Sequence, residues 1–312
     1  MPHEPRRTDP PMRVTISGAS GLVGGPLASF LAAGGHRVDP LVRREPQPGS
    51  TEIRWDPGAG NLDPAALEGV DAAVNLSGET IAGTWTAARK AAIRDSRVDS
   101  TRLLVRAMCA LKRKPRVLIS ASAVGYYGDR GEAELSEDSS AGRDFLADVA
   151  QQWEAETRPA ADAGVRVVNL RIGVVLSPRG GALAQLLAPF RAGLGGVVGD
   201  GRQYMSWIAL DDLVGLIQFA IFNDALRGPL NATAPNPVTN HEFTKALGRV
   251  LHRPTVVPLP AFAVKLMFGE MGETLLLAGQ RVLPARALAA GFQFFHPELE
   301  DALRFELGMI SA

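Results

Sequence analysis

The order of hydrophobic and polar positions defines two kinds of segment that alternate along the first part of the chain. Short apolar runs rich in β-branched residues predict strands, and longer stretches with one apolar helical face predict helices. We expect strands at residues 13–17, 36–42, 52–55, 72–76, 117–121 and 165–171, and helices at residues 22–33, 86–111 and 143–163. This alternation predicts an α/β fold with a doubly wound parallel sheet and right-handed crossovers.

Beyond residue 176 the pattern becomes irregular, with many glycines followed by many prolines. Such residues interrupt regular elements, so we expect loops and short helices that form a smaller C-terminal substrate lobe. Asp211 and Asp212 precede an apolar stretch at 213–222 and predict a capped helix that returns to the larger domain. The expected organisation is a disordered leader at 1–11, a larger domain at 12–230 and a C-terminal domain at 231–312, with 177–210 contributing to the substrate lobe.

Composition narrows the class of function. The 33 basic residues balance the 33 acidic ones, so no overall positive field favours nucleic acid, and we expect a small-molecule substrate instead. No apolar stretch approaches the roughly 20 residues of a membrane span, and we expect a cytoplasmic protein. Cys109 is the single cysteine and the five histidines are scattered, so no metal site is expected. The oligomeric state stays open.

Three glycines spaced by three residues, Gly18, Gly21 and Gly24, lie between the first predicted strand and helix. At such a turn, glycines let backbone N–H groups approach a pyrophosphate, and the helix N-terminus adds partial positive charge. This context predicts a Rossmann-type dinucleotide-binding domain. We expect the cofactor to contact the turn through Gly18, Ser20, Gly21, Leu22, Val23 and Gly24.

The end of the second predicted strand bears on the choice of dinucleotide. NAD-specific sites place an acid there for the ribose 2′-hydroxyl, but this strand ends in Arg43 and Arg44. Asp39 lies inside the strand, before Pro40, and comes too early. Because guanidinium groups suit a 2′-phosphate, the sequence predicts NADP(H) over NAD, the alternative being two solvated loop arginines.

Several further blocks resemble the extended short-chain dehydrogenases/reductases. They are Asn75-Leu-Ser-Gly78, the segment ISASAVGYYG at 119–128, and the segment SWIALDD at 206–212. Trp55-Asp-Pro57, Ser96-Arg-Val98, Gly199-Asp-Gly-Arg-Gln203 and Gly279-Gln-Arg-Val-Leu-Pro284 are similar to one bacterial group, described as sugar-nucleotide epimerases with a C-terminal domain of unknown function. The resemblance spans about residues 12–305.

The resemblance implies roles for individual residues. Asp56 would lie near the adenine edge, and the adenosine ribose would be flanked by Leu76, Ser77 and Gly78. Ser122 falls on the catalytic hydroxyl of the group. The block from Ser122 to Gly128 is one residue longer than usual, so either Tyr126 or Tyr127 could occupy the familiar tyrosine position.

One departure from the family bears directly on catalysis. Oxidoreductases of this fold use a tyrosine and a lysine four positions apart on one helix to move a proton as hydride moves. No Tyr-x-x-x-Lys occurs in this chain, and Phe145 and Val149 fall at those two positions. Neither side chain can transfer a proton.

Other residues are candidate substitutes or ligand contacts. Glu79 and the tyrosine pair share a rim of the sheet with Ser122, and we expect them to converge near the nicotinamide; a structural role for Glu79 is the alternative. Lys90 is expected to be a solvated helix residue. Further candidates are Arg171 as a cofactor-side or interlobe ion-pair residue, and Gln203 and Trp207 as substrate contacts, with core packing as the alternative for Trp207.

Two hypotheses for function follow. The first is an NADP-dependent oxidoreductase or epimerase-like enzyme that acts on an unidentified small molecule, such as a nucleotide-sugar, with Ser122 and a substitute acid. The second is an NADP(H)-binding sensor or regulatory protein without turnover. The cell-division-inhibitor label that some relatives carry names no mechanism. Convergence of the candidate side chains beside the cofactor favours the first hypothesis, and their burial in the core favours the second.

Overall fold

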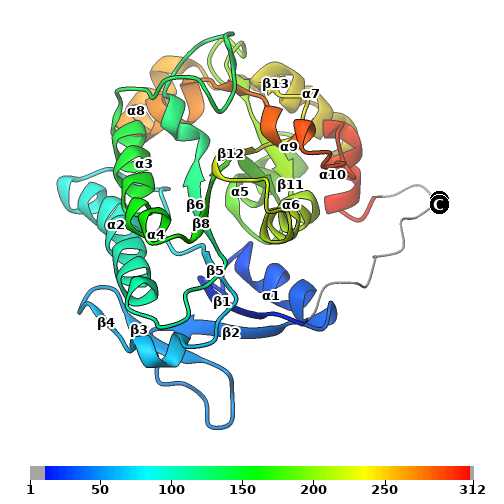
Figure 1. Ribbon diagram of the computed structural model, residues 1–312. Coiled ribbons are helices and arrows are strands. Elements are labelled where there is room, and N and C mark those ends of the chain that lie inside the picture. The colour runs from blue at the N-terminus through cyan, green and yellow to red at the C-terminus, as the bar shows by residue number, and fades with distance from the viewer. Residues whose placement is uncertain (1–10, 310–312) are drawn as a thin grey trace.

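The larger domain is built on an eight-stranded sheet (Figure 1). The computed structural model describes residues 11–309. The strand order of the sheet is β12-β8-β6-β5-β1-β2-β3-β4, and all neighbouring strands are parallel except β3 and β4. The strands are β1 (Arg13–Ser17), β2 (Arg37–Val42), β3 (Ile53–Asp56), β4 (Asn61–Leu62), β5 (Ala72–Asn75), β6 (Val117–Ala123), β8 (Arg166–Ile172) and β12 (Gly228–Ala232). The predicted α/β fold with a doubly wound parallel sheet is confirmed.

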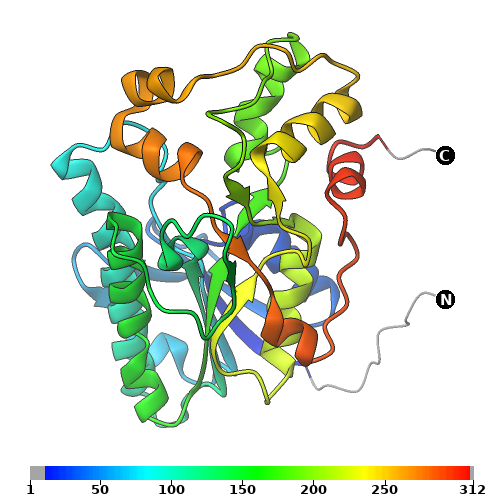
Figure 2. The same cartoon turned by 90° about the horizontal axis from the view of Figure 1, so that it is seen from above.

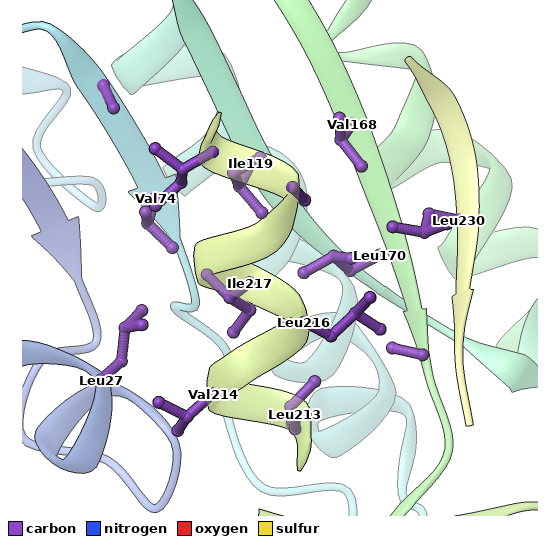
Figure 3. Packing of buried hydrophobic residues seen from close by; sticks show 14 of the residues in the cluster. Leu27, Val74, Ile119, Val168, Leu170, Leu213, Val214, Leu216, Ile217 and Leu230 are labelled. Atoms are coloured by element: carbon purple, nitrogen blue, oxygen red, sulfur yellow. The ribbon is translucent and has the colours of Figure 1, made fainter. Parts of the chain in front are cut away.

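Helices cover both faces of this sheet because its strands are apolar on both sides. On one face, α1 (Gly24–Ala33) and α6 (Leu210–Phe222) share a core with β1, β5, β6 and β8. Figure 3 shows α6 directing Leu213, Val214, Leu216 and Ile217 toward the sheet residues Val74, Ile119, Val168 and Leu170. On the other face lie α2 (Ala87–Cys109), α3 (Phe145–Ala155) and α4 (Arg158–Asp162), with η1 (Pro64–Leu67) beside them. Alternate strand residues therefore face different helix layers.

Two predictions about helices are wrong. The helix expected at 143–163 is broken, because Pro159 lies in the first turn of α4 and cannot donate a backbone bond to continue α3. Asp211 and Asp212 do not cap α6, whose N-cap is Ala209. Instead, the buried Asp212 carboxylate accepts bonds from the backbone nitrogens of Phe295, at 2.7 Å, and His296, at 3.0 Å. This aspartate ties a late loop to α6.

The smaller lobe contains short strand pairs and helices around its own core. Figure 2 shows α5, α7 and α8 gathered at one end of the molecule, with the start of α2 beside α8. The remaining helices of the described chain are η2 (Val124–Tyr127), α5 (Gly181–Arg191), α7 (Asn240–Leu251), α8 (Ala261–Gly272), the π-helical turn η3 (Glu273–Leu277), α9 (Ala285–Ala289) and α10 (Leu299–Glu306); η2 and α9 pack on the larger domain. The remaining strands are β7 (Glu134–Leu135), β9 (Val174–Leu176), β10 (Tyr204–Met205), β11 (Trp207–Ala209), β13 (Val238–Thr239) and β14 (Arg281–Val282). Of the helices within residues 11–309, none has the length and apolar character to cross a bilayer.

Candidate functional site

The glycine turn between β1 and α1 leaves no room for side chains at two of its positions. A Cβ atom on Gly24 would lie 2.2 Å from the Gly18 carbonyl oxygen, and a Cβ on Gly18 would lie 2.8 Å from the Leu76 oxygen. Gly18 also has a φ of +70°, which favours glycine. The structure therefore has the close backbone packing that a dinucleotide-binding turn requires.

The amide groups of this turn are available to a ligand. The Gly21 amide bonds to the Gly18 carbonyl at 2.9 Å, but within residues 11–309 the amides of Ser20, Leu22 and Val23 have no acceptor. Free amides at the start of a helix favour an anion. Three of the six residues predicted to contact the cofactor at this turn thus have amides without an acceptor in the described part of the chain.

A buried chain of hydrogen bonds fixes the end of β5 beside this turn. Ser17 Oγ donates to Asn75 Oδ1 at 2.6 Å, and Asn75 Nδ2 donates to Thr101 Oγ1 on α2 at 2.7 Å. Trp153 Nε1 on α3 donates to the same hydroxyl at 2.8 Å. These bonds join two strands and two helices, and they hold the backbone of 76–78 next to Gly18.

The two arginines after β2 differ in their contacts. Arg44 binds both carboxylate oxygens of Glu52, at 2.5 and 3.0 Å, whereas the exposed Arg43 has no ion pair or hydrogen bond within residues 11–309. Asp39 is fully buried and is held by Arg13 and Arg37. Its carboxylate is therefore occupied within the protein. Arg43 is the guanidinium that remains free for a phosphate.

Asp56 ends β3 and is half-buried. Its Oδ1 accepts a bond from the Ala59 amide at 3.1 Å and shapes the turn to β4. One carboxylate oxygen is used in this turn, and the expected contact with adenine stays a prediction.

Ser122 lies in a buried polar network rather than in an open cleft. Its Oγ donates to Glu154 Oε1 on α3 at 2.7 Å. The same carboxylate accepts two bonds from Arg171 on β8, at 2.8 and 2.9 Å, and Arg171 Nη1 donates to the Tyr127 hydroxyl at 3.0 Å. Ser122 and Arg171 are each only 3% exposed, so water is largely excluded from the network. We call these four residues the serine–arginine network.

The two tyrosines belong to the same region. Tyr127 is fully buried and donates its hydroxyl proton to Asn231 Oδ1 at 2.6 Å. Burial raises the pKa of Tyr127, although the Arg171 charge opposes that rise. The Tyr126 ring stacks on the Arg171 guanidinium, with Cζ 3.4 Å from the ring centroid. The Tyr127 hydroxyl proton is thus used in a hydrogen bond to Asn231, and the raised pKa makes this phenol a weaker acid.

Glu79 does not join this network, and its expected convergence with Ser122 near the nicotinamide stays a prediction. The exposed Glu79 carboxylate contacts Arg89 Nη1 on α2 at 3.3 Å. Ser122, in contrast, belongs to the β6 positions that face the α3 side of the sheet, and its hydroxyl is bound by Glu154. The Glu79 carboxylate and the Ser122 hydroxyl are therefore bound to different partners, on α2 and α3 respectively.

The two residues that the resemblance places at the relay positions, Phe145 and Val149, both lie on α3. Phe145 begins α3 and packs edge-on against Trp85, with ring centroids 5.2 Å apart, and Val149 is buried. Lys90 Nζ lies 4.9 Å from the Phe145 ring centroid and 2.6 Å from Glu270 Oε1 on α8. Lys90 therefore bridges the two lobes, which differs from the expected solvated position.

The candidate substrate contacts of the smaller lobe are used internally. Trp207 is fully buried and donates to the Asn236 carbonyl at 3.0 Å, which supports the core-packing alternative. Gln203 Nε2 donates to the carbonyls of Val198, at 3.0 Å, and Leu276, at 2.8 Å. These contacts hold the glycine-rich loop against η3.

Two polar residues of this region, Glu154 and Arg97, were not predicted from the sequence. Arg97 lies on α2, and its guanidinium packs against Gly78. The block Ser96-Arg-Val98 contained the signal for Arg97, but nothing in its pattern distinguished a buried cation from a solvated one. Among residues 11–309, no group of three histidine, cysteine or carboxylate side chains could hold a metal ion.

Comparison with known proteins identifies the family. A profile of the NAD dependent epimerase/dehydratase family matches residues 14–230, and a domain of unknown function matches residues 259–306. An epimerase family protein of Mycobacterium bovis is 48% identical over 94% of this chain and 96% of its own length. The crystal structure of the human epimerase family protein SDR39U1 with NADPH has a TM-score of 0.87 and 37% identity, covering 96% of this chain and all of that one.

More distant structures share the fold alone. MoeE5 in complex with UDP-glucuronic acid and NAD is 22% identical, with a TM-score of 0.77 over 95% of this chain and 98% of that one. The TM-scores show that these solved structures share the fold of this chain. The chain thus belongs to the NAD dependent epimerase/dehydratase family, of the extended short-chain dehydrogenase/reductase type, with a C-terminal domain of unknown function.

Proposed function

We propose that this protein binds NADP(H) as its main ligand and responds to it, without catalysing the epimerase reaction. The proposal rests on the hydrogen-bond partners of two hydroxyl groups, those of Ser122 and Tyr127. Ser122 and Tyr127 are bonded to Glu154, Asn231 and Arg171 inside the protein, while the relay positions hold Phe145 and Val149.

The residues present fit a dinucleotide. The closely packed Gly18 and Gly24 and the free amides of Ser20, Leu22 and Val23 would receive the pyrophosphate. Arg43, which has no partner within residues 11–309, would receive the 2′-phosphate of NADP(H). The NADPH bound to the human relative supports this assignment.

The same residues argue against epimerase turnover. A bound nicotinamide can donate or accept hydride, but the substrate oxygen must then gain or lose a proton. A positioned general acid or base contributes about 10²–10⁴-fold to such a step. Phe145 and Val149 supply no proton, and Glu79 is paired with Arg89. Binding without proton transfer suits a protein that senses the nucleotide.

A second candidate function rests on Lys90. Its ammonium group lies over the ring of Phe145, which occupies the place of the relay tyrosine. If Glu270 released it, Lys90 could give a proton to a substrate, and the protein would be a reductase. Turnover of a carbonyl compound that Lys90→Met abolishes, with NADPH affinity retained, would favour this candidate.

The ligand that copurifies with the full chain provides the direct test. We expect native mass spectrometry to show NADP(H) bound at up to one per chain, and titration to show tighter binding of NADPH than of NADH. Recovery of a sugar nucleotide beside the cofactor would instead indicate an enzyme with a trapped substrate. Failure of NADPH and NADH to bind at all would overturn the proposal.

A further inference from the structure

A cavity lies on the side of the sheet that α3 and α4 cover. Its walls come from these two helices, from the first half of β8 and from the loop before β12, and none of the residues predicted to contact the cofactor lines it. Its volume is about 720 Å³, and sites for small molecules commonly enclose roughly 300–1,000 Å³. The cavity is therefore large enough for a second ligand, away from the glycine turn.

The Asn169 side chain lines this cavity and contains a polar atom without a partner. The residue is only 8% exposed. Its Nδ2 donates to Thr157 Oγ1 at 3.3 Å, but its Oδ1 is closed off from solvent and accepts no hydrogen bond within residues 11–309. Thr157 Oγ1 donates its own proton to the Glu154 carbonyl at 2.7 Å, so it can only accept from Asn169. This fixes which end of the amide is unpaired.

A ligand with an O–H or N–H group would satisfy this oxygen. Buried polar atoms without a partner cost free energy, and native proteins retain few of them. The 3.3 Å bond to Thr157 is long, so it holds the Asn169 amide loosely. The torsion that turns an asparagine amide also has broad energy wells, so the oxygen can rotate toward a donor in the cavity. The first requirement on a ligand is thus a hydroxyl or amino group.

The charged groups of the cavity give the second requirement. Three arginines and one carboxylate line it, but Glu154 is neutralised by Arg171, at 2.8 and 2.9 Å. Arg166 is held by the carbonyls at the end of α6, at 2.7 and 2.8 Å. The exposed Arg158 and Arg227 form no ion pair with any other residue that the structure describes. Two guanidiniums without a counter-charge favour a phosphate or a carboxylate.

Tyr126 borders the same cavity and adds one more polar group. Its ring stacks on the Arg171 guanidinium, which fixes the orientation of the side chain. Its hydroxyl makes no hydrogen bond in the described part of the chain and, unlike Asn169 Oδ1, is not closed off from solvent. A phenol can both donate and accept, so this hydroxyl is available to a further polar group of a ligand.

We propose that this cavity binds a small hydroxylated oxyanion, at a site separate from the one assigned to NADP(H). The acidic group of the ligand pairs with Arg158 and Arg227, and a hydroxyl of the ligand donates to Asn169 Oδ1. A sugar phosphate and a hydroxy acid share this chemistry. The inference goes beyond the proposed function and does not depend on it.

Calorimetric titration of the full chain with glucose 6-phosphate and with L-malate tests this site. Inorganic phosphate and succinate are the matched ligands without the hydroxyl groups. We expect saturable binding of at least one hydroxylated probe, at one per chain, and at least tenfold weaker binding of its match. Binding of one probe alone identifies the phosphate ester or the hydroxy acid as the class, and binding of both means that the shared chemistry suffices. Failure of both to bind, or equal affinity for a bound probe and its match, would overturn the inference.

The same titration in the presence of saturating NADPH separates the two sites. We expect the affinity for the probe to change less than twofold. If NADPH displaces the probe, the anion occupies the cofactor site, and the inference fails while the proposed function stands. If NADPH does not bind but substitutions in the cavity weaken the probe, the proposed function fails and the inference stands.

Substitutions on the cavity walls locate the bound probe. We expect Asn169→Leu to weaken it at least tenfold, and the double variant Arg158→Gln with Arg227→Gln to do the same. Both arginines are exposed, so the double variant should fold normally. Arg191→Gln is the matched control, because Arg191 is an exposed arginine on α5 that does not line the cavity; its effect should stay below twofold. Wild-type affinity in the cavity variants would overturn the inference.

Thermal stability gives a readout that separates binding from structural support. Asn169→Leu removes an unpaired buried oxygen, so the melting temperature of the ligand-free variant should equal or exceed that of the wild type. The rise in melting temperature on adding the probe should be lost. A lower melting temperature with unchanged affinity for the probe would mean that Asn169 only supports Thr157, and would contradict the proposed site.

Discussion

Around Gly18 and Leu76 the backbone is closely packed and its amides are free, whereas around Ser122 and Arg171 polar side chains satisfy one another. Both regions lie at the carboxyl edge of one sheet, where ligands of open α/β folds bind. The first keeps the groups that a dinucleotide needs. The second uses its hydroxyl groups to hold β6, β8 and α3 together. The two regions thus differ in whether their polar groups are free for a ligand or bound within the protein.

The largest effect should come from breaking the serine–arginine network. Glu154→Ala leaves Arg171 buried without a counter-charge, which costs about 3–5 kcal/mol in the free energy of unfolding. Urea denaturation measures this loss. Glu156→Ala is the control, because Glu156 contacts the exposed Arg102 and should contribute below about 1 kcal/mol. Equal losses in the two variants would contradict a structural role for the network.

The next effect should come from closing the glycine turn. Gly24→Ala brings a Cβ against the Gly18 carbonyl, and we expect NADPH affinity to fall at least a hundredfold, about 2.8 kcal/mol. Gly25→Ala is the matched control, since its Cβ would lie at an ordinary 3.5 Å from the Ala19 oxygen. Calorimetric titration measures both variants. Full NADPH affinity in a folded Gly24→Ala protein would place the cofactor elsewhere.

The arginines after β2 should set cofactor preference with a smaller effect. Arg43→Ala should reduce the ratio of NADPH to NADH affinity about tenfold, or about 1.4 kcal/mol. Arg44→Ala should reduce it less, because Arg44 is bound by Glu52. Titrations of each variant with NADPH and with NADH measure the two changes in preference. If the wild type binds NADPH and NADH equally, the 2′-phosphate contact does not exist.

The smallest effect should follow the loss of one hydroxyl. Ser122→Ala removes a single bond to Glu154 and should lower the free energy of unfolding by about 1 kcal/mol. NADPH affinity should stay unchanged. Ser120→Ala, on the same face of β6, should lower stability less, because the Ser120 hydroxyl makes only a 3.4 Å contact. A large loss of NADPH affinity in Ser122→Ala alone would place this serine at the cofactor.

Local patterns explain what the sequence could predict. The strands and the glycine turn depend on residues close together in the chain, so their positions were predicted within one or two residues in most cases. The break before α4 also has a local cause in Pro159, which the helical pattern of 143–163 concealed. Sequence periodicity thus specified the layers and the cofactor turn.

Long-range polar partners explain what the sequence could not predict. Ser122 and Glu154 are 32 residues apart, and Asp212 binds a backbone amide 83 residues later. Whether the Arg44 guanidinium is free depends on Glu52, eight residues later, to which it is bound. Whether a hydroxyl or guanidinium is free for a ligand is decided by such partners. For this reason the course of the backbone was easier to predict than the partners of the polar side chains.

The central claim is that the cofactor binds where no proton relay exists. It is tested most directly by incubating the NADP+ complex of the wild-type protein with a panel of UDP-sugars and following nicotinamide absorbance and sugar configuration together. The account predicts a stable complex with no nicotinamide reduction and no epimer formed. Epimerisation with transient nicotinamide reduction, abolished by Ser122→Ala while NADP+ stays bound, would contradict it.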